Sequence, residues 1–369
     1  MKKILLFLSA WPLIVVAQNS YTISNIAGVT ANYASLQGAL DSVPDGSILY
    51  LFPSTVSYGG AVVKKKVAIY GTGFLLEQNA PPATTPNTYG VNLQYLDIKQ
   101  GGSSSYIEGI QFNNINFAQV PTLPVGTPLQ IDSAANVIIS RCGFFPHGGG
   151  YFITTNTTYN TIIRDSYFDL NESGEGNNSN MLNDNSSGST GLQFRNNIIT
   201  NRRVNMGFGA YNILPNSDIS FINNTFVVRM ASSNFQNMKY VNNIFVDTDT
   251  TAAVSPASVY LNGEVHHNVT NRTTLFSPQS FNTQGINPDS VFVYSGFGFF
   301  SEDQQWQLRS NSFVNTYATD GLACGAYGGD NPYTLSGIPH LPNIYSLTIA
   351  RDTTKRGNVL VHIKAKASN

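Results

Sequence analysis

The sequence has few charged residues, and this scarcity limits the partners that the protein can bind. Only 11% of its 369 residues are Asp, Glu, Lys or Arg, whereas a typical soluble domain has about 25%. The 20 basic residues nearly balance the 21 acidic ones, so the net charge is −1. Such a chain has no general electrostatic attraction to nucleic acid or to an anionic membrane. We therefore expect no nucleic-acid partner, and any ionic ligand must be met by local groups.

Cysteine is also scarce. The two cysteines, Cys142 and Cys324, lie far apart in the chain and in no CxxC spacing. This excludes a disulfide scaffold and a cysteine-based metal or redox motif. We interpret both residues as buried free thiols.

Long apolar runs are absent except at the N-terminus, where residues 1–17 have the features of an export signal. Lys2 and Lys3 precede an apolar run over 4–16, and the small residue Ala17 suits a cleavage site. No later stretch reaches the roughly 18 apolar residues that a membrane-spanning helix needs. We expect a secreted protein without a membrane span, which begins near Gln18 after cleavage.

Asparagine, in contrast, is abundant. The 41 asparagines equal the number of all acidic and basic residues together. Asparagine tolerates the left-handed backbone conformation of tight turns and bonds to neighbouring peptide groups. The composition therefore favours short strands joined by many turns.

Seven stretches of the sequence align without gaps and define a repeat of about 25 residues. Each contains a short pattern in which alternate residues are apolar, which is typical of a strand with one inward face. An irregular period of this size suits a coil of three short strands joined by variable loops. The alignment gives one anchor residue per coil, and the last anchor is Thr270. We expect the six anchors before it to form one inward stack: Phe117, Phe145, Phe168, Ile199, Phe226 and Phe245.

Polar residues recur two positions before these anchors. Stacked coils place equivalent residues about 4.8 Å apart, so each side-chain amide can bond to the next. The recurrence predicts an asparagine ladder, and independent surface turns are the alternative. The position is occupied by Gly143 and Ser166 and then by Asn197, Asn224, Asn243 and Asn268.

The aligned unit, clearest in ISFINNTFV and YVNNIFV, resembles the parallel β-helix repeat of the pectin lyase-like superfamily. The segment from Tyr33 to Phe74 is similar to the usual opening of that fold, in which an amphipathic helix covers the open end. Residues 320–347 resemble the tail of secreted bacterial β-helix proteins. The resemblance implies an all-β fold, a right-handed parallel β-helix with a short N-terminal capping helix. Four apolar residues share one face of the expected helix: Leu36, Ala39, Leu40 and Val43.

We divide the chain into an export signal (1–17), one β-helix domain with its cap (18–343), and a C-terminal segment (344–369). That last segment should form two strands, over 345–349 and 359–363, around the polar turn RDTTKRGN. We expect these strands to cover the last coil. No linker or change in composition marks a further domain, and we expect a monomer.

Enzymes with this fold include polysaccharide lyases, hydrolases and esterases, and their sequence signatures are missing here. The hydrolase set NTD, DD, HG and RIK is represented only by His147-Gly148. The lyase segments WiDH and RxPxxR and the esterase GxxDFIFG do not occur. His147 could act as a general base on a loop, or it could be a turn residue beside glycines.

Two further groups could bind a metal. Glu172, Glu175 and Asp184 in the insertion over 171–190 offer oxygen ligands for Ca²⁺, and a surface loop without metal is the alternative. His266 and His267 are neighbours, so on a strand they should point to opposite faces and not share a metal. We expect no metal site and no cofactor, with Ca²⁺ as the one open possibility.

The last candidate is a column of arginines. Arg141, Arg164 and Arg195 lie four residues before successive anchors, on the outward side of the strand. Guanidinium groups about 5 Å apart repel by roughly 1 kcal/mol in water, so the column favours an anionic ligand. Asp165 and Asp169 could supply part of the balance, and an acidic sugar polymer the rest through bidentate contacts. The alternative is that the side chains fan apart into solvent.

Two functions remain open. The first is a secreted β-helix protein that binds carbohydrate, or has a cell-surface or matrix role, without a recognisable catalytic site. The second is a polysaccharide lyase or glycoside hydrolase of an unfamiliar family that acts on an acidic glycan. The missing signatures favour the first. A groove with two carboxylates, or with a basic residue beside clustered acids, would favour the second.

Overall fold

The computed structural model describes most of the chain after the expected export signal. The described residues are 18–79, 87–113, 127–145, 150–170, 179–185, 188–201, 210–211, 213, 217–230, 237–253, 264–276, 281–293, 301–351 and 359–366.

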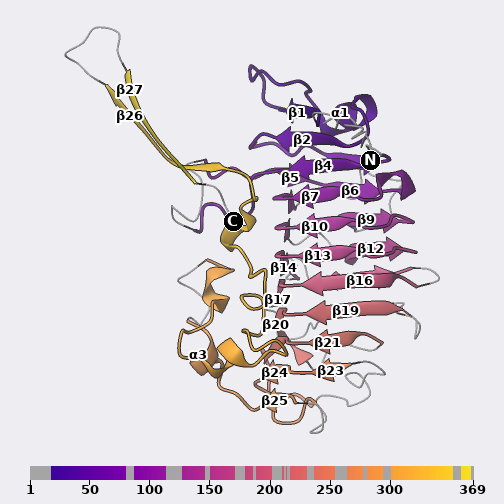
Figure 1. The fold of residues 1–369 in the computed structure, drawn as a ribbon, viewed down its shortest axis with the longest axis vertical. Coiled ribbons are helices and arrows are strands. Elements are labelled where there is room, and N and C mark those ends of the chain that lie inside the picture. Colours follow the sequence, from indigo (N-terminus) through magenta and orange to yellow (C-terminus); the bar gives the residue numbers. More distant parts are fainter. Residues whose placement is uncertain are drawn as a thin grey trace, which may run out of the picture.

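Three parallel sheets wind around one core (Figure 1). Sheet A contains β1 (Ser20–Ile23), β2 (Ser47–Leu51), β4 (Val67–Tyr70), β7 (Tyr106–Glu108), β10 (Ile138–Ser140), β13 (Ile162–Arg164), β16 (Thr190–Arg195), β19 (Asp218–Ile222), β21 (Lys239–Val241) and β23 (Val265–His266). Sheet B contains β3 (Gly60–Val63), β6 (Tyr95–Ile98), β9 (Leu129–Asp132), β12 (Gly150–Asn156), β15 (Ser179–Asp184) and β18 (Ala210–Tyr211). Sheet C contains β5 (Asn92–Leu93), β8 (Gln111–Phe112), β11 (Gly143–Phe144), β14 (Tyr167–Asp169), β17 (Ile198–Thr200), β20 (Thr225–Val228), β22 (Ile244–Asp247), β24 (Val269–Thr270) and β25 (Thr283–Gln284).

Each coil passes from sheet A to sheet C and then to sheet B, as β7, β8 and β9 do. All pairings within these three sheets are parallel, because the chain returns to the same strand position after every full coil. This order of strands confirms the parallel β-helix expected from the repeat. Within the described residues, no helix is both long and apolar enough to cross a membrane.

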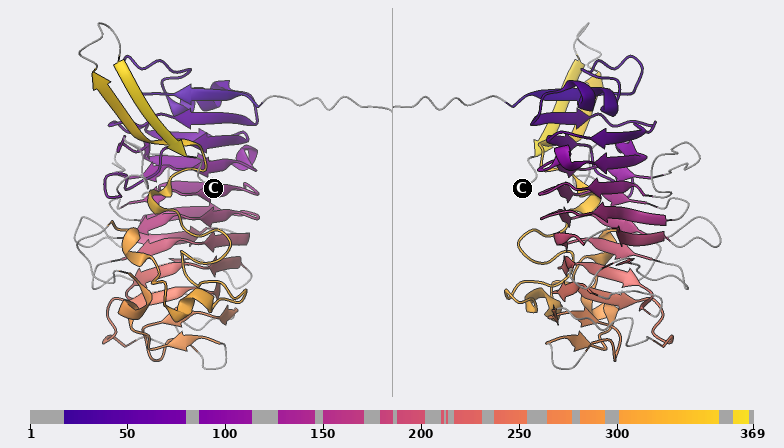
Figure 2. Two further views of the ribbon diagram at one scale, coloured as in Figure 1. Left: turned by 60° about the vertical axis from the view of Figure 1, so that its left-hand side comes forward. Right: turned by 90° about the vertical axis from the view of Figure 1, so that its right-hand side faces the viewer.

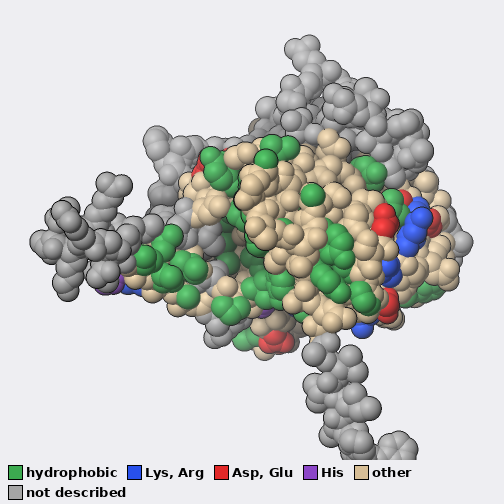
Figure 3. Space-filling model, turned by 90° about the horizontal axis from the view of Figure 1, so that it is seen from above, with side chains coloured by type: hydrophobic (Ala, Val, Ile, Leu, Met, Phe, Trp, Pro, Cys, Tyr) green, Lys and Arg blue, Asp and Glu red, His purple; other side chains and the backbone are tan. Residues whose placement is uncertain are grey.

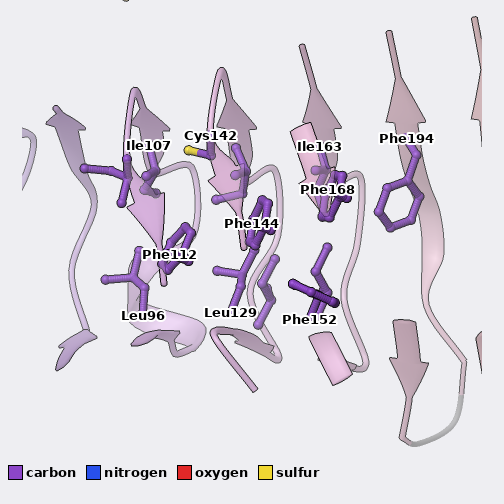
Figure 4. Packing of buried hydrophobic residues seen from close by; sticks show 14 of the residues in the cluster. Leu96, Ile107, Phe112, Leu129, Cys142, Phe144, Phe152, Ile163, Phe168 and Phe194 are labelled. Atoms are coloured by element: carbon purple, nitrogen blue, oxygen red, sulfur yellow. The ribbon is translucent and has the colours of Figure 1, made fainter. Parts of the chain in front are cut away.

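The core consists of inward side chains that stack from coil to coil (Figure 4). In sheet C, the rings of Phe144 and Phe168 lie 4.4 Å apart and nearly parallel, and those of Phe226 and Phe245 lie 4.7 Å apart. Ile199 lies between these two pairs in register. The stack is therefore as expected from Phe168 onward.

The predicted anchor Phe145 is wrong by one residue. Phe168 pairs with Phe144, not Phe145, and Phe144 pairs with Phe112. Phe145 packs on the outside of the coil against Phe74, with ring centroids 6.3 Å apart. Phe117, the other expected anchor, lies outside the described residues. Two adjacent phenylalanines, one inward and one outward, give no sign in sequence of which is which.

A short helix, α1 (Leu36–Ser42), lies beside the first strands at the N-terminal end of the solenoid (Figure 1). It begins at Ser35, whose hydroxyl accepts a hydrogen bond from the Gly38 N–H, as expected of an N-cap. Its buried face holds the residues that the sequence pattern placed together: Leu36, Ala39, Leu40 and Val43.

After the last coil and a one-turn helix, α3 (Pro288–Val291), the chain turns back along the solenoid. We call residues 301–342 the strap. Its first residues bond to Gln78 and Asn79, and from Gly325 to His340 it contacts earlier and earlier coils. The strap contains three short 3-10 helices, η4 (Gln304–Trp306), η5 (Phe313–Thr316) and η6 (Leu335–Gly337). It covers the corner between sheets A and C.

The strap leads to the N-terminal end of the solenoid, so the C-terminal strands do not cover the last coil as we expected. Strands β26 (Asn343–Arg351) and β27 (Val359–Lys366) do form the expected antiparallel hairpin. The hairpin projects beside the first coils, however, and not over the last one (Figures 1 and 2). Ile344 and Leu347 at its base share a groove with Phe52 and Gly71 of those first coils.

Candidate functional site

From β7 onward, each coil turns from sheet A into sheet C through one residue in the left-handed region, where φ is positive. Such a conformation is uncommon for residues other than glycine, and asparagine and aspartate adopt it most readily. The φ values of the six non-glycine corner residues lie between 51° and 59°. In chain order the corner residues are Gly109, Arg141, Asp165, Asn196, Asn223, Asn242 and His267.

In the later coils, the residue after the corner is a buried asparagine, and its side chain bonds to the next coil. The amide nitrogen of Asn197 donates to Oδ1 of Asn224 over 3.0 Å, and Asn224 and Asn243 repeat the contact toward Asn243 and Asn268. Asn268 donates to Asn282 in the same way. Each Oδ1 also accepts a backbone N–H from the preceding coil. Each of these coils thus supplies both a donor and an acceptor to the row of buried asparagines, and the row is satisfied from within the stack.

In the earlier coils, the same corner carries charge. Glu108 is fully buried, and Arg141 is buried beside it with 3.6 Å between Nε and the carboxylate. The strap completes the group, because His340 Nδ1 lies 2.5 Å from Glu108 Oε1 and His340 Nε2 lies 2.7 Å from Arg141 Nη2. Arg141 Nη1 also donates to the Ile338 carbonyl over 2.6 Å. Both ring nitrogens of His340 are occupied, so the residue fastens the strap and is not available as a base.

Asp165 occupies the next corner and is 2% exposed. The pKa of its carboxyl group is raised to about 7, mainly by burial; Arg164 and Arg141 act to lower this pKa, and nearby Glu108 acts to raise it. Arg164 Nε lies 3.9 Å from Asp165 Oδ2. A carboxyl group with a pKa near neutrality beside arginines has the chemistry of a general acid or base. Its burial keeps it from direct contact with a large ligand.

Several buried polar atoms around this corner have no hydrogen-bond partner among the described residues. They include two acceptors, Glu108 Oε2 and Asp165 Oδ1, and two donors, Nε of Arg141 and Nε of Arg164. Buried polar atoms in folded proteins are normally satisfied by protein, water or ligand. The concentration of such atoms at one corner distinguishes the charged coils from the asparagine coils.

A polar groove begins at Arg164 and follows the outer surface across strands β13, β16, β19 and β21. Its volume is about 350 Å³. Sheet A and the corner residues form one wall, and the strap forms the other. The lining residues are Ile162, Arg164, Arg195, Asn196, Ile222, Asn223, Val241, Asn242, Thr319, Asp320, Asp330 and Asn331.

The predicted arginine column is only partly present. Arg164 and Arg195 pair in register on β13 and β16, and both line the groove. Arg141 does not belong to the column, because Ser140 takes that strand position and Arg141 is the buried corner residue. The error has the same origin as the wrong anchor in this coil, a shift of one residue.

The two predicted acids also separate. Asp165 is at the charged corner beside Arg164 and Arg141, as described above. Asp169 lies on β14 in sheet C, where it pairs in register with Thr200. It does not line the groove.

The other predicted candidates give no open metal site. His147, Glu172 and Glu175 lie outside the described residues. Asp184 is fully buried and accepts hydrogen bonds from Thr155, Ser189 and Ser217. Across the described part of the chain, no three metal-binding side chains come together.

The histidine pair departs from the expected geometry. His266 ends β23, and His267 has a φ of 56°. The turn brings the two Nδ1 atoms within 3.1 Å, so they face each other and do not point to opposite sides. Burial, with a contribution from His266, lowers the pKa of His267.

Both cysteines are buried free thiols, as predicted. Burial raises the pKa of Cys142 to about 12, and that of Cys324 likewise to about 12. Neither is a reactive thiolate at neutral pH.

Four groups of the site were not predicted: Glu108 and His340 at the charged corner, and Asp320 and Asp330 on the strap wall of the groove. Glu108 has one sequence signal, since a glutamate ends a strand pattern that is otherwise apolar or aromatic. The strap residues have none, because they come from a segment without a repeat.

Comparison with known proteins gives similarity of fold only. No protein-family model and no curated protein matches the chain. Among solved structures, the pectate lyase Pel9A is similar with 11% identity and a TM-score of 0.48, over 85% of this chain and 97% of that one. A mutant of the PL6-family alginate lyase AlyGC is similar with 13% identity and a TM-score of 0.24, over 80% of this chain and 58% of that one. The assignment of the parallel β-helix rests on the order and pairing of the strands.

Proposed function

We propose that this chain is an exported protein that binds an acidic polysaccharide in the groove beside the strap, without cleaving it. The observation that carries the proposal is the pair of Arg164 and Arg195 in register on neighbouring strands. Side chains in register on neighbouring strands are close enough for one carboxylate to bind both guanidinium groups through charge-assisted hydrogen bonds. Arg195 is exposed and Arg164 partly so, which leaves both within reach of a polymer.

The remaining groove suits a sugar chain that runs along the solenoid axis. It crosses four strands of sheet A, and strands about 4.8 Å apart give it a length of roughly 15 Å. Ile162, Ile222 and Val241 offer apolar contacts, while Oδ1 of Asn223 has no hydrogen-bond partner within the described residues and can accept from a hydroxyl group. Alternating apolar and amide surface fits the two kinds of surface on a sugar ring.

Binding without cleavage is favoured by the burial of the acids nearest the arginines. Glu108 and Asp165 are 0% and 2% exposed, and the strap lies over the corner that holds them. Two observations favour the second candidate, a lyase or hydrolase: Asp320 and Asp330 place two carboxylates on the strap wall of the groove, and the pKa of Asp165 is raised to about 7 next to Arg164. Movement of the strap would be needed to bring that carboxyl group to a substrate.

The test uses the purified mature protein with polygalacturonate and alginate as acidic polymers and dextran as a neutral control. Affinity is measured at low and moderate salt, and the same mixtures are assayed for new reducing ends and for absorbance from unsaturated products. We expect salt-sensitive binding of an acidic polymer and no products. Products would establish the second candidate, and the absence of salt-sensitive binding would refute the proposal.

Export is part of this proposal and rests on the pattern of residues 1–17. Sequencing the N-terminus of protein recovered outside the cells should give Gln18 or a residue close to it. A mature protein that retains residues 1–17 would contradict it.

A further inference from the structure

The C-terminal hairpin has one apolar and one polar face. Across its two strands Leu347 lies opposite Ile363, and Val361, two residues before Ile363, lies on the same face. An irregularity at Tyr345 keeps Ile344, which pairs with Ala365, on the same face as these residues. The other face carries Ser346 with Lys364, and Thr348 with His362.

The apolar face is open. Ile344, Leu347, Val361 and Ile363 are 44%, 48%, 46% and 58% exposed. Hydrophobic side chains gather on the projecting hairpin when the molecule is seen from above (Figure 3). A two-stranded sheet is only marginally stable unless something packs on its apolar face. We therefore expect another apolar surface to pack on this face of the hairpin.

A groove of about 570 Å³ runs beside the hairpin and continues its apolar surface. It lies between the first coils and the end of the strap, and none of the described residues that line it is acidic or basic. The base of the hairpin belongs to both surfaces. The lining residues are Phe52, Pro53, Gly71, Thr72, Asn87, Ile338, Pro339, Leu341, Pro342, Ile344 and Leu347.

We infer that a second copy of this chain covers this surface, in a dimer in which each hairpin lies in the groove of the other. A ridge and a groove that adjoin on one molecule are self-complementary under a twofold axis, because each copy offers what the other needs. The inference replaces the expectation of a monomer. It does not depend on polysaccharide binding.

The surface area that the dimer would bury also favours an arrangement in which each hairpin lies in the groove of the other copy. Strands of eight to nine residues are about 30 Å long, and a two-stranded face is about 10 Å wide, so it covers roughly 300 Å². Two hairpins packed only on each other would bury about 600 Å² in total, which is typical of crystal contacts. Two hairpins in two grooves bury about 1,200 Å², the lower limit for a specific interface.

The charges argue against two other arrangements. Lys364 and His362 project from the face opposite the apolar one, so in a membrane-bound hairpin they would point away from the lipid headgroups. Pairing of two β27 edges would bring Lys364 and Lys366 close to their copies, and like charges on neighbouring strands are unfavourable. Packing of apolar faces keeps the basic faces apart and in solvent.

The first test is the molar mass of the mature protein by sedimentation equilibrium over a wide concentration range. We expect a reversible dimer for the wild type. Ile363→Asp should weaken dimerisation at least tenfold, while Thr348→Asp, which adds the same charge on the other face, should leave it unchanged. A wild-type protein that stays monomeric at every concentration overturns the inference. Binding of that monomer to anionic lipid vesicles would overturn it equally, because the apolar face would then have a different partner.

A cysteine experiment covers the case in which Ile363→Asp unfolds the hairpin. The native thiols are buried, so an introduced cysteine is the only accessible one among the described residues. Oxidation of Ile363→Cys should give a disulfide-linked dimer in high yield, and oxidation of the neighbouring Lys364→Cys should not. Equal yields, or a higher yield from Lys364→Cys, overturn the proposed packing.

Discussion

The early and the late coils make the same turn between sheets A and C with different chemistry. In the late coils, Asn224 and its equivalents bond from coil to coil. In the early coils, Glu108, Arg141 and Asp165 occupy or adjoin the turn and are buried. An amide both donates and accepts, so a row of amides satisfies itself. A carboxylate only accepts and a guanidinium only donates, so the charged corner depends on a complement from elsewhere.

The strap is that complement for the early coils. His340 and Ile338 bond to Glu108 and Arg141. The strap also bonds to the late corners, through Asn196 and Asn242, but the buried asparagine row behind those corners is satisfied by its own amides. One stretch of the solenoid therefore satisfies its buried turn from within, whereas the other takes hydrogen-bond partners from the strap. The groove with Arg164 and Arg195 begins where the two stretches meet.

The largest expected effect comes from breaking the charged corner. Arg141→Ala leaves the buried carboxylate of Glu108 without its ion-pair partner and removes the donor to Ile338. We expect a loss of about 4 kcal/mol of unfolding free energy, the usual cost of breaking a buried pair. Chemical denaturation measures it, and faster proteolysis within residues 301–342 would report release of the strap. Arg195→Ala, on the exposed side of the strand, should change stability by less than about 0.5 kcal/mol.

The second-largest expected change in stability comes from giving an early corner the asparagine that the late corners have. Asp165→Asn places asparagine where Asn196 and Asn223 already adopt the same φ in later coils. The folded-state pKa of Asp165 is raised to about 7, above the value of about 3.9 expected in the unfolded chain. Between these values the folded state holds a proton that the unfolded state has lost, so wild-type stability falls as the pH rises from about 4 to 7.

The measurement compares the unfolding free energies of wild type and Asp165→Asn across this pH range. Their difference should shift in favour of the variant by up to about 4 kcal/mol between pH 4 and 7 and stay constant above pH 7. A difference that does not change with pH would show that Asp165 is ionised normally in the fold.

A slightly smaller loss is expected in the asparagine row. Asn224→Ala removes an acceptor for Asn197 and a donor to Asn243 and to the Phe194 carbonyl, all of them buried. Leaving such groups unsatisfied should cost about 3 kcal/mol. The exposed Asn185 provides a matched control, and Asn185→Ala should be nearly neutral in the same denaturation experiment. Equal effects would mean that the row does not stabilise the solenoid.

The sequence was sufficient for the fold because the solenoid repeats a local rule. Alternating apolar residues and recurrent asparagines mark each coil, and stacking identical turns converts that pattern into sheets. The predicted register was wrong where the sequence pattern is ambiguous. Phe144 and Phe145 are both aromatic, and Ile110 and Phe112 fit an alternating strand of sheet A or of sheet C. The contact of His340 with Glu108 spans 232 residues and follows no periodicity. The position of the strap and the composition of the charged corner therefore could not be predicted from the repeat pattern.

The central claim is that Arg164 and Arg195 bind an acidic polymer, and one titration tests it most directly. Polygalacturonate is titrated into the wild type, into Arg164→Gln/Arg195→Gln, and into Lys64→Gln/Lys66→Gln, which removes the same charge from exposed sites near the first coils. We predict at least a tenfold loss of affinity at low salt, about 1.4 kcal/mol, for the arginine variant alone. Equal affinities for all three proteins, or equal losses in both variants, would contradict the account.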